Sequence, residues 1–245
     1  MKNILIVGAT TAIAAACARR WCEGGVRFYL VGRSADKLRQ VADDLSARGA
    51  EVHTCELDLN VLESHASLVR EAFAWLGRVD VVLVAHGTLP DQKACEQDAE
   101  LAIREFTSNG LSVISLLTHL ANPMEAQGSG SIGVISSVAG DRGRPSNYLY
   151  GSAKSAVTAF CGGLRARLFK ASVNLTTIKP GFVDTPMTKG LLLPAPLVAT
   201  PEQVAADIAK AMDAGKGVLY TRWFWRYIML IITHIPDRIF RKMSM

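Results

Sequence analysis

Seven apolar runs of strand length, separated by segments of helical composition, are the feature that most limits how this 245-residue chain can fold. They lie near residues 4, 28, 52, 79, 131, 173 and 217, and they read ILIVG, FYLVG, VHTCEL, VDVVLVA, SIGVISS, VNLTTIKP and GVLYT. Continuous apolarity bounded by turn residues is typical of strands buried on both faces. The alternation predicts an α/β protein with a doubly wound, parallel seven-stranded sheet and helices on both faces.

One intervening segment shows the helical pattern clearly. Between residues 36 and 48, apolar residues recur at spacings of three and four, and Gly49 follows as a helix stop: Leu38, Val41, Ala42 and Leu45. No repeat or low-complexity linker interrupts the alternation. We therefore expect one domain over residues 1–221, large enough for a single well-filled core, with an appended tail over residues 222–245.

Cysteine usage and the amino terminus both bear on the compartment. No pair of cysteines has a spacing such as C-x-x-C, and at least three lie in segments expected to be helix or strand: Cys17, Cys22, Cys55, Cys95 and Cys161. This pattern favours a reducing, cytoplasmic compartment. The first apolar run ends at Gly8, too early for the apolar core of a signal peptide, so we do not expect export.

The turn after the first run carries a nucleotide-binding signal. It reads Gly8-Ala-Thr-Thr-Ala-Ile-Ala14 and leads into a helical stretch through Arg20. Such a turn presents backbone N–H groups and a helix amino terminus to a pyrophosphate, which would use Gly8, Thr10, Thr11, Ala12 and Ile13. Ala12 and Ala14 stand where the pattern usually has glycines, so an ordinary strand-to-helix turn is an equally good interpretation of this segment alone.

The end of the second run indicates which nucleotide would bind. It reads Leu30-Val-Gly-Arg33-Ser, without the carboxylate that binds a ribose 2′-hydroxyl at this place. A guanidinium matches the geometry of a 2′-phosphate through two hydrogen bonds. Arg33 therefore favours NADP(H) over NAD(H), and the alternative is a solvated loop arginine.

A tyrosine and a lysine four residues apart indicate acid/base chemistry. The segment Tyr148-Leu-Tyr150-Gly-Ser-Ala-Lys154 places Tyr150 and Lys154 on one helix face, whereas Tyr148 has no basic residue four positions on. An adjacent ammonium can lower the pKa of a phenol toward neutral pH. A surface pair with no catalytic role is the alternative.

Ser137 precedes Tyr150 by 13 positions within the run ISSVAG…YLYGSAK. This combination resembles the short-chain dehydrogenase/reductase family over residues 1 to about 221. The resemblance implies a single-domain Rossmann fold and hydride transfer between a nicotinamide cofactor and a carbonyl or hydroxyl group. It implies that Tyr150 exchanges the proton, Ser137 polarises the substrate oxygen, Lys154 perturbs Tyr150 and holds the nicotinamide ribose, and Asn109 anchors a proton-relay water.

Three further segments match the family by position. Asp58 and Leu59 resemble the pair that contacts adenine, and a later segment resembles the one that meets the nicotinamide carboxamide: Pro180, Gly181, Val183 and Thr185. After the fourth run the family's Asn-Asn-Ala-Gly is replaced by Val84-Ala85-His86-Gly87, in which Ala85 and Gly87 would line the cofactor. His86 is interpreted as filling the place of a structural amide, with a substrate-facing proton donor as the alternative.

The remaining four histidines have no carboxylate or cysteine partners at metal-ligand spacing, so we expect no metal site. The segment between Thr185 and Thr200 corresponds in the family to a mobile cover of the substrate. Its apolar residues would form that cover, or would be buried on the domain itself, and the two interpretations are equally good: Leu191, Leu192, Leu193 and Leu197.

The tail is apolar, basic and short. Its run from Trp223 to Ile235 has 13 residues, below the roughly 20 that a spanning helix needs. Aromatic residues flanked by arginines predict an amphipathic helix in the headgroup region of an anionic membrane, with a dimer interface or a cover over the cleft as the alternative: Trp223, Trp225, Tyr227, Arg222 and Arg226. Basic residues interleaved with bulky aliphatic ones argue against nucleic acid.

Within the family, the chain is similar to a narrower bacterial group through the Gly8 turn, residues 85–90, residues 136–144 and the Trp-Phe-Trp tail. This group resembles the reductases of decaprenylphosphoryl-2-keto-ribose. The resemblance implies NAD(P)H-dependent reduction of a polyprenyl-phosphate-linked keto-sugar in cell-envelope glycan synthesis, by a homodimer or homotetramer that is cytoplasmic or peripheral on the membrane. The alternatives are a reductase of a free lipid ketone, such as a 3-oxoacyl thioester or a sterol-like compound, and a non-catalytic NADP-binding regulatory protein.

Overall fold

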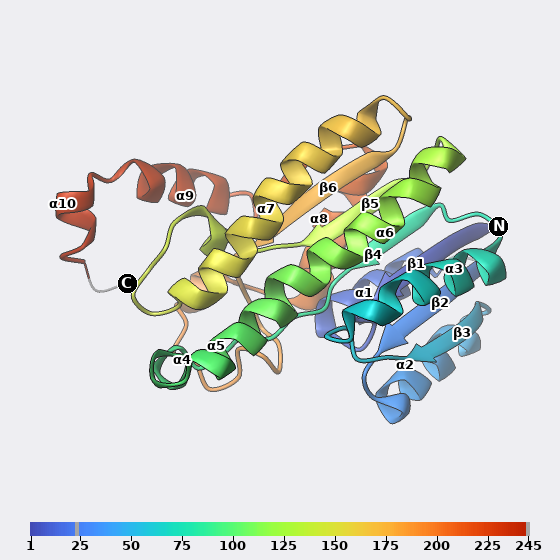
Figure 1. Ribbon diagram of the computed structural model, residues 1–245, viewed down its shortest axis with the longest axis horizontal. Helices are drawn as coiled ribbons and strands as arrows, with labels where there is room; N and C mark the ends of the chain where they lie inside the picture. The colour runs from blue at the N-terminus through green and yellow to red at the C-terminus, as the bar shows by residue number, and fades with distance from the viewer. Residues whose placement is uncertain (23–24, 244–245) are drawn as a thin grey trace.

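A parallel sheet of seven strands forms the centre of the computed structural model, which describes residues 1–22 and 25–243 (Figure 1). The strands lie in the order β3-β2-β1-β4-β5-β6-β9. They are β1 (Lys2–Val7), β2 (Val26–Gly32), β3 (Glu51–Glu56), β4 (Val81–Val84), β5 (Ser131–Ile135), β6 (Asn174–Pro180) and β9 (Val218–Thr221). The predicted doubly wound α/β fold with seven strands is confirmed.

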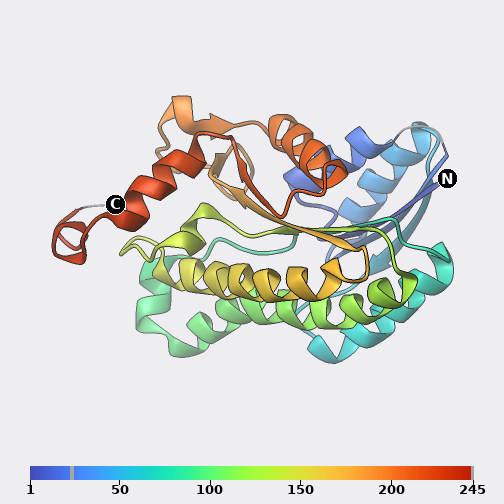
Figure 2. The same ribbon diagram turned by 90° about the horizontal axis from the view of Figure 1, so that it is seen from above.

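Helices cover both faces of this sheet, and each face has its own apolar core (Figure 2). One face is covered by α1 (Ala12–Trp21), α2 (Ala35–Ala47) and α8 (Pro201–Asp213). The other is covered by α3 (His65–Leu76), α6 (Ser112–Gln127) and α7 (Tyr148–Phe169), with the short helices α4 (Gln92–Gln97) and α5 (Ala99–Phe106) leading into α6. Central strand residues such as Ile6 and Leu83 are fully buried, as their continuous apolar runs predicted.

The helix expected over residues 36–48 is α2. The side chain of Ser34 accepts a hydrogen bond from the backbone N–H of Lys37 and begins the helix, while Leu38 and Leu45 are buried against the sheet. Local capping and apolar periodicity therefore agree here with the observed element.

The order of the strands reverses between β1 and β4, which are neighbours although β2 and β3 lie between them in the sequence. Connections from β1 run toward one edge of the sheet, and those from β4 run toward the other. Two loops therefore diverge at the carboxyl ends of β1 and β4, which leaves a crevice, the usual ligand position in open α/β sheets.

The segment between the Pro-Gly turn and α8 contains a small element that the sequence analysis missed. Phe182–Val183 (β7) pairs in parallel with Val198–Ala199 (β8), so both ends of the connecting segment are held together. Strands of two residues have no periodicity to detect. Within the segment, Leu191 and Leu192 are exposed, whereas Leu197 packs against the tail.

The tail is helical, as predicted, but it forms two helices, α9 (Trp225–His234) and α10 (Asp237–Phe240). Pro236 explains the division, because the residue before a proline is disfavoured in the helical region, and Ile235 has an extended ψ of 125°. Within the described residues, no helix is long and apolar enough to cross a membrane.

Candidate active site

The turns after β1 and β4 meet at the crevice with almost no space between them. Gly8 has a φ of +82°, and a Cβ placed there would lie 2.5 Å from the backbone nitrogen of His86. Only glycine fits this conformation and this contact. Of the three glycines usual in this turn, only Gly8 is present in the chain. The packing of the two loops requires a glycine at this position.

A cavity of about 240 Å³ adjoins this contact. The side chain of Thr11 caps α1 by accepting from the N–H of Ala14, and the first-turn N–H groups of Ala12 and Ile13 have no intrahelical acceptors. The structure brings much of the predicted nucleotide site into the lining of this cavity: Gly8, Thr10, Thr11, Arg33, Asp58, Leu59 and Gly87. A glycine cradle beside a free helix amino terminus fits the pyrophosphate and adenosine of a dinucleotide.

Two cations line this cavity where β2 ends and α2 begins. Arg33 follows β2 and is exposed, and Lys37 lies in the first turn of α2. Arg33 was predicted from the sequence and Lys37 was not, although its place in the first turn of the helix predicted over residues 36–48 was a detectable signal. Arg33 and Lys37 are both exposed and line the cavity, so both side chains can reach an anion bound there.

The predicted catalytic serine is held against the helix that carries the tyrosine and lysine. Ser137 begins a short 3₁₀ helix, Val138–Asp141, and its Oγ accepts a hydrogen bond from the N–H of Ala139 at 3.1 Å. A Cβ on Gly140 would lie 2.8 Å from the backbone of Lys154, so this 3₁₀ helix packs directly on α7. That contact brings together residues that lie 13 and 17 positions apart.

Lys154 is buried in this site without a carboxylate partner within 4.0 Å among the described residues. Its Nζ donates to the carbonyl of Ile135 at 3.2 Å and lies 5.7 Å from the centroid of the Tyr150 ring. Because burial disfavours the ammonium, the pKa of Lys154 is lowered to about 8.

The pKa of Tyr150 differs from the expectation. The spacing of Tyr150 and Lys154 predicted that the ammonium would lower this pKa, but burial raises the pKa of Tyr150 to about 12, and a hydrogen bond with Ser137 offsets the rise only in part. Removing the phenolate from water costs more than the nearby groups return. At neutral pH Tyr150 is therefore a protonated phenol, the state that a proton donor needs.

Asn109 lies on the opposite wall, in a π-helical turn between α5 and α6 over residues 107–111. Its side chain is buried, donates to Thr88 Oγ1 at 2.8 Å and to the carbonyl of Glu105 at 3.0 Å, and accepts from the N–H of Thr88 at 2.9 Å. π-bulges occur preferentially at functional sites. A Cβ on Gly87 would lie 2.8 Å from Asn109 Oδ1 and 3.4 Å from Lys154 Nζ, so Asn109 holds the loop after β4 close to Lys154.

His86 faces the same crevice but behaves as a neutral side chain. Its Nε2 lies 2.9 Å from Ser112 Oγ, and burial, together with the charge of Lys154, lowers the pKa of His86 to about 3. Its Nδ1 is buried without a partner among the described residues. A ring that stays neutral at physiological pH agrees with the interpretation of a structural hydrogen-bonding group, and Ala85 beside it is buried.

The predicted nicotinamide segment, residues 180–185, leaves the carboxyl end of β6 and lies under the tail. Val183 is buried, and its carbonyl accepts from Thr188 Oγ1 at 2.6 Å. The backbone N–H of Thr185 donates to the same hydroxyl at 3.2 Å. A Cβ on Gly181 would lie 1.9 Å from the indole of Trp225. The tail therefore packs directly on the turn that follows Pro180.

A buried ionic network stands behind Ser137 and was missed by the sequence analysis. Lys179 Nζ donates to Asp141 Oδ1 at 2.5 Å, and the hydroxyl of Tyr220 donates to Asp141 Oδ2 at 2.8 Å. Both charged side chains are less than 10% exposed. Lys179 was a detectable signal, because it is a charged residue inside an otherwise apolar strand. Its partner, Asp141, could not be assigned without the fold.

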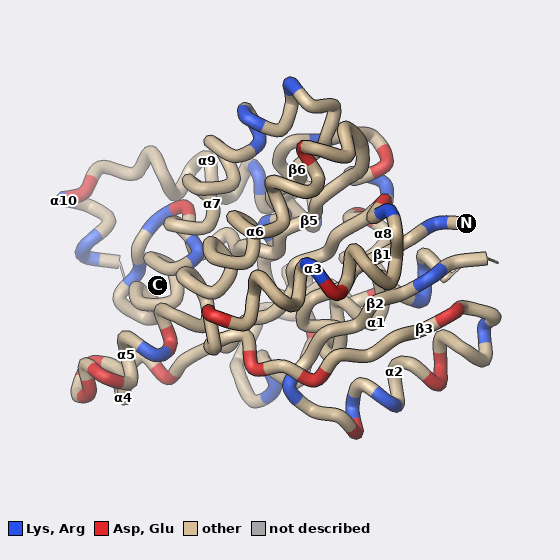
Figure 3. The backbone as a smooth tube through the Cα atoms, turned by 45° about the vertical axis from the view of Figure 1, so that its right-hand side comes forward, with Lys and Arg blue, Asp and Glu red and all other residues tan. Residues whose placement is uncertain are grey.

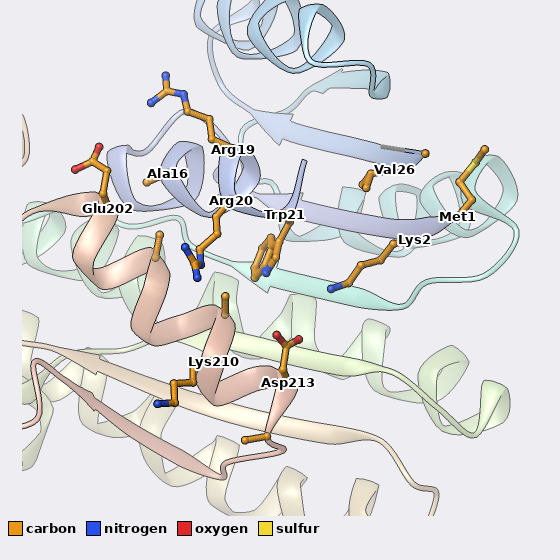
Figure 4. Close-up of a pocket in the computed structure, with 14 residues that line it drawn as sticks. Met1, Lys2, Ala16, Arg19, Arg20, Trp21, Val26, Glu202, Lys210 and Asp213 are labelled. Atoms are coloured by element: carbon orange, nitrogen blue, oxygen red, sulfur yellow. The ribbon is translucent and has the colours of Figure 1, made fainter. Parts of the chain in front are cut away.

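A larger cavity than the one beside Gly8 lies elsewhere, between α1 and α8 (Figure 4). It measures about 1050 Å³ and is lined by residues of both charges, with Arg20 and Trp21 pointing from α1 toward α8. None of Ser137, Tyr150 and Lys154 lines it. We therefore assign the chemistry to the crevice at the carboxyl ends of β1, β4 and β5.

The fold and the site define a Rossmann-type oxidoreductase: a dinucleotide cradle at the strand-order reversal, next to a Ser-Tyr-Lys cluster. The profile of the short chain dehydrogenases matches residues 2–193. The chain belongs to this family, whose members are oxidoreductases that use NAD(P).

Curated relatives agree with this assignment, and a solved structure shows the same fold. The chain is 40% identical over 241 residues to an uncharacterized oxidoreductase of Mycobacterium tuberculosis, covering 98% of this chain and 96% of the relative. It is 33% identical to an uncharacterized oxidoreductase of Streptomyces coelicolor, covering 99% and 96%, and 27% identical to a 3-oxoacyl-[acyl-carrier-protein] reductase of Chlamydia muridarum, covering 83% and 87%. The crystal structure of gox2181 shares the fold, with a TM-score of 0.83 at 20% identity over 92% of this chain and 96% of that one.

Proposed function

We propose that this protein reduces a ketone to a secondary alcohol with NADPH, and that Tyr150 is the general acid. The observation that carries the proposal is a protonated phenol whose ring centroid lies 5.7 Å from a buried ammonium, which has no carboxylate within 4.0 Å in the part of the chain that the structure describes. The bound cofactor would supply the hydride. The hydroxyl of Ser137 would donate a hydrogen bond to the carbonyl oxygen, Tyr150 would transfer its proton to that oxygen, and Lys154 would stabilise the phenolate left behind.

The preference for NADP(H) rests on Arg33 and Lys37, which place two positive charges at the adenosine end of the cavity. A 2′-phosphate would meet both, whereas a 2′-hydroxyl gains little from either. Arg33→Asp should therefore weaken NADPH binding far more than NADH binding in a fluorescence titration. Arg39→Asp, an exposed arginine of α2, is the matched control and should change neither, whereas equal losses for both nucleotides in Arg33→Asp would contradict the assignment.

For the substrate, we infer a polyprenyl-phosphate-linked keto-sugar. The segment that joins Ser137 to Tyr150 contains two buried polar atoms without partners among the described residues, Arg144 Nε and Asn147 Oδ1. The guanidinium donor and the amide acceptor could bind the phosphate and hydroxyl groups of a sugar phosphate. A sterol-like ketone has no matching polar groups for them. The exposed Leu191 and Leu192 of the neighbouring cover would suit a lipid chain.

A 3-oxoacyl thioester is the second candidate, because the Chlamydia muridarum relative carries the name of a 3-oxoacyl-[acyl-carrier-protein] reductase. The test is NADPH oxidation, followed at 340 nm, with a phosphate-bearing 2-keto-sugar lipid, a 3-oxoacyl thioester and a neutral cyclic ketone. We expect turnover with the first and loss of at least about tenfold in kcat/KM for Ser137→Ala, but not for the exposed Ser152→Ala. If no ketone is reduced, the non-catalytic alternative stands; if only the thioester is reduced, the sugar proposal fails.

A further inference from the structure

The outward side of α9 is apolar and uncovered. Its inward side packs on the catalytic domain through Trp225 and Met229, which are 3% and 1% exposed. On the opposite side lie Tyr227, Leu230 and Ile231, and Trp223 stands in the turn just before the helix, four residues ahead of Tyr227; the four side chains are 56–68% exposed. A helix that is apolar on both sides requires a partner for each side, so the outward side lacks one.

Positive charge surrounds this outward side. The tail carries five basic side chains and one carboxylate, that of Asp237, and Figure 3 shows the basic positions along α10. Arg222 lies 3.9 Å from Asp207; within residues 25–243 and 1–22 no ion pair is found for the other four, which are Arg226, Arg238, Arg241 and Lys242. The surface is thus electrostatically complementary to an anion.

A cavity of about 590 Å³ continues this surface between α8, β9 and the tail. Two aromatic rings of the tail and one of β9 line it together with three cations: Trp223, Tyr227, Tyr220, Lys210, Lys216 and Arg226. Aromatic rings beside ammonium and guanidinium groups are the combination found where proteins meet lipid headgroups. Asp207 is the one carboxylate in the lining that lies near the tail, and it already contacts Arg222 and Thr221.

The tail is also fixed in orientation. Arg142, five residues after Ser137, donates to the carbonyls of Ile232 and Ile235 at 2.7 and 2.6 Å, and its guanidinium lies 3.8 Å from the centroid of the Phe240 ring. Together with Trp225 on Gly181, this contact holds the tail at the end of the sheet where the strands finish (Figures 1 and 2). Whatever binds the outward side therefore lies at the same end of the molecule as the active site.

We propose that this surface docks the protein on an anionic lipid bilayer. Trp223, Tyr227, Leu230 and Ile231 insert at the level of the headgroups, and the surrounding arginines bind lipid phosphates. A second copy of the chain is the less favourable occupant, because a two-fold contact would bring two sets of five basic side chains together. The proposal does not depend on which ketone is reduced.

Co-sedimentation with vesicles tests the proposal without any activity measurement. Wild-type protein should sediment with vesicles of phosphatidylcholine and phosphatidylglycerol but not with phosphatidylcholine alone. The variant Trp223→Ser/Leu230→Ser/Ile231→Ser should lower the bound-to-free ratio at least about tenfold, since three inserted side chains are lost. Arg238→Gln/Arg241→Gln should lower it about fivefold for each arginine.

Matched control variants show whether vesicle binding depends on the tail residues or on exposed apolar and basic side chains anywhere on the protein. Phe169→Ser removes an apolar side chain that is 79% exposed at the far end of α7, and Arg39→Gln/Arg104→Gln removes two exposed arginines elsewhere. Both should sediment like wild type, and all variants should keep the wild-type circular dichroism and bind NADPH. Wild-type protein left in the supernatant, or a triple variant that binds as well as wild type, would overturn the proposal. The proposal would also be overturned, in favour of a second copy, if the wild-type protein were a dimer, the triple variant alone were a monomer, and neither bound vesicles.

Discussion

Two buried lysines lie on either side of the segment that carries Ser137, and they differ in one respect. Lys179 is paired with Asp141 at 2.5 Å and with the hydroxyl of Tyr220, whereas Lys154 has a backbone carbonyl and the face of Tyr150. Burial costs each ammonium its hydration. The ion pair with Asp141 offsets this desolvation for Lys179. No such pair offsets it for Lys154, and the pKa of Lys154 is lowered to about 8.

This difference separates a charge that joins two elements of the fold from the charge to which we assign a role in the proposed reaction. The Lys179–Asp141 pair joins β6 to the 3₁₀ helix after Ser137 and so positions the serine. Within the described residues the ammonium of Lys154 has no carboxylate within 4.0 Å, and in the proposed mechanism it would stabilise the phenolate of Tyr150. An unpaired buried charge that costs stability is expected where the charge serves catalysis.

The largest expected effect comes from making Lys179 resemble Lys154. Asp141→Asn removes the carboxylate and leaves a buried ammonium without its counter-ion, which should lower the free energy of unfolding by about 3 kcal/mol. Urea unfolding measures this. Adding Lys179→Met to the same variant removes the unpaired charge and should restore most of the loss; a double variant as unstable as the single one would show that the ion pair is not the cause.

The next effect has the opposite sign. Between pH 8 and 10.5 folded Lys154 binds fewer protons than unfolded Lys154, so its contribution to the free energy of unfolding rises with pH through that window and is most unfavourable below pH 8. Lys154→Met removes that cost but also the hydrogen bond to Ile135, a net gain of about 2 kcal/mol at pH 7. The gain should shrink toward pH 10 in urea unfolding, while ketone reduction is lost.

The exposed Lys170→Met is the control for this variant and should leave stability unchanged at both values of pH. A Lys154→Met protein that is less stable than wild type at pH 7 would mean that the ammonium is compensated after all. The comparison between the two lysines would then fail.

The smallest effect concerns the segment that both lysines flank. Arg142→Ala removes the contacts to the carbonyls at the end of α9 and should cost about 1 kcal/mol, confined to the tail. Limited proteolysis should cut the variant faster within residues 233–243 than wild type, while Arg39→Ala behaves as wild type. Equal cleavage rates would show that Trp225 alone holds the tail.

The elements with strong local signals were predictable from the sequence. Seven apolar runs became seven strands, and the helix beginning after Ser34 formed within one residue of its predicted bounds, because burial and capping act over short distances. Tyr150 and Lys154 were found because a helix brings residues four apart onto one side. Ser137 required the family's spacing, since the contact through Gly140 depends on tertiary packing.

Other features required the fold. The Asp141–Lys179–Tyr220 network joins residues 38 and 79 positions apart, and no local pattern pairs them. The pKa of Tyr150 is raised by burial, and the spacing of the motif does not show how buried a side chain will be. The two-residue strands β7 and β8 are too short for any periodicity.

The measurement that tests the central claim most directly compares two tyrosines of α7 that lie two residues apart. Tyr150→Phe should lower NADPH-dependent ketone reduction at least about a hundredfold while the Kd for NADPH stays within about twofold, because the variant loses the proton donor and keeps the cofactor cradle. Tyr148→Phe, at an exposed position without a lysine four residues on, should reduce the ketone as wild type does. A Tyr150→Phe protein that retains most of its turnover would contradict the account.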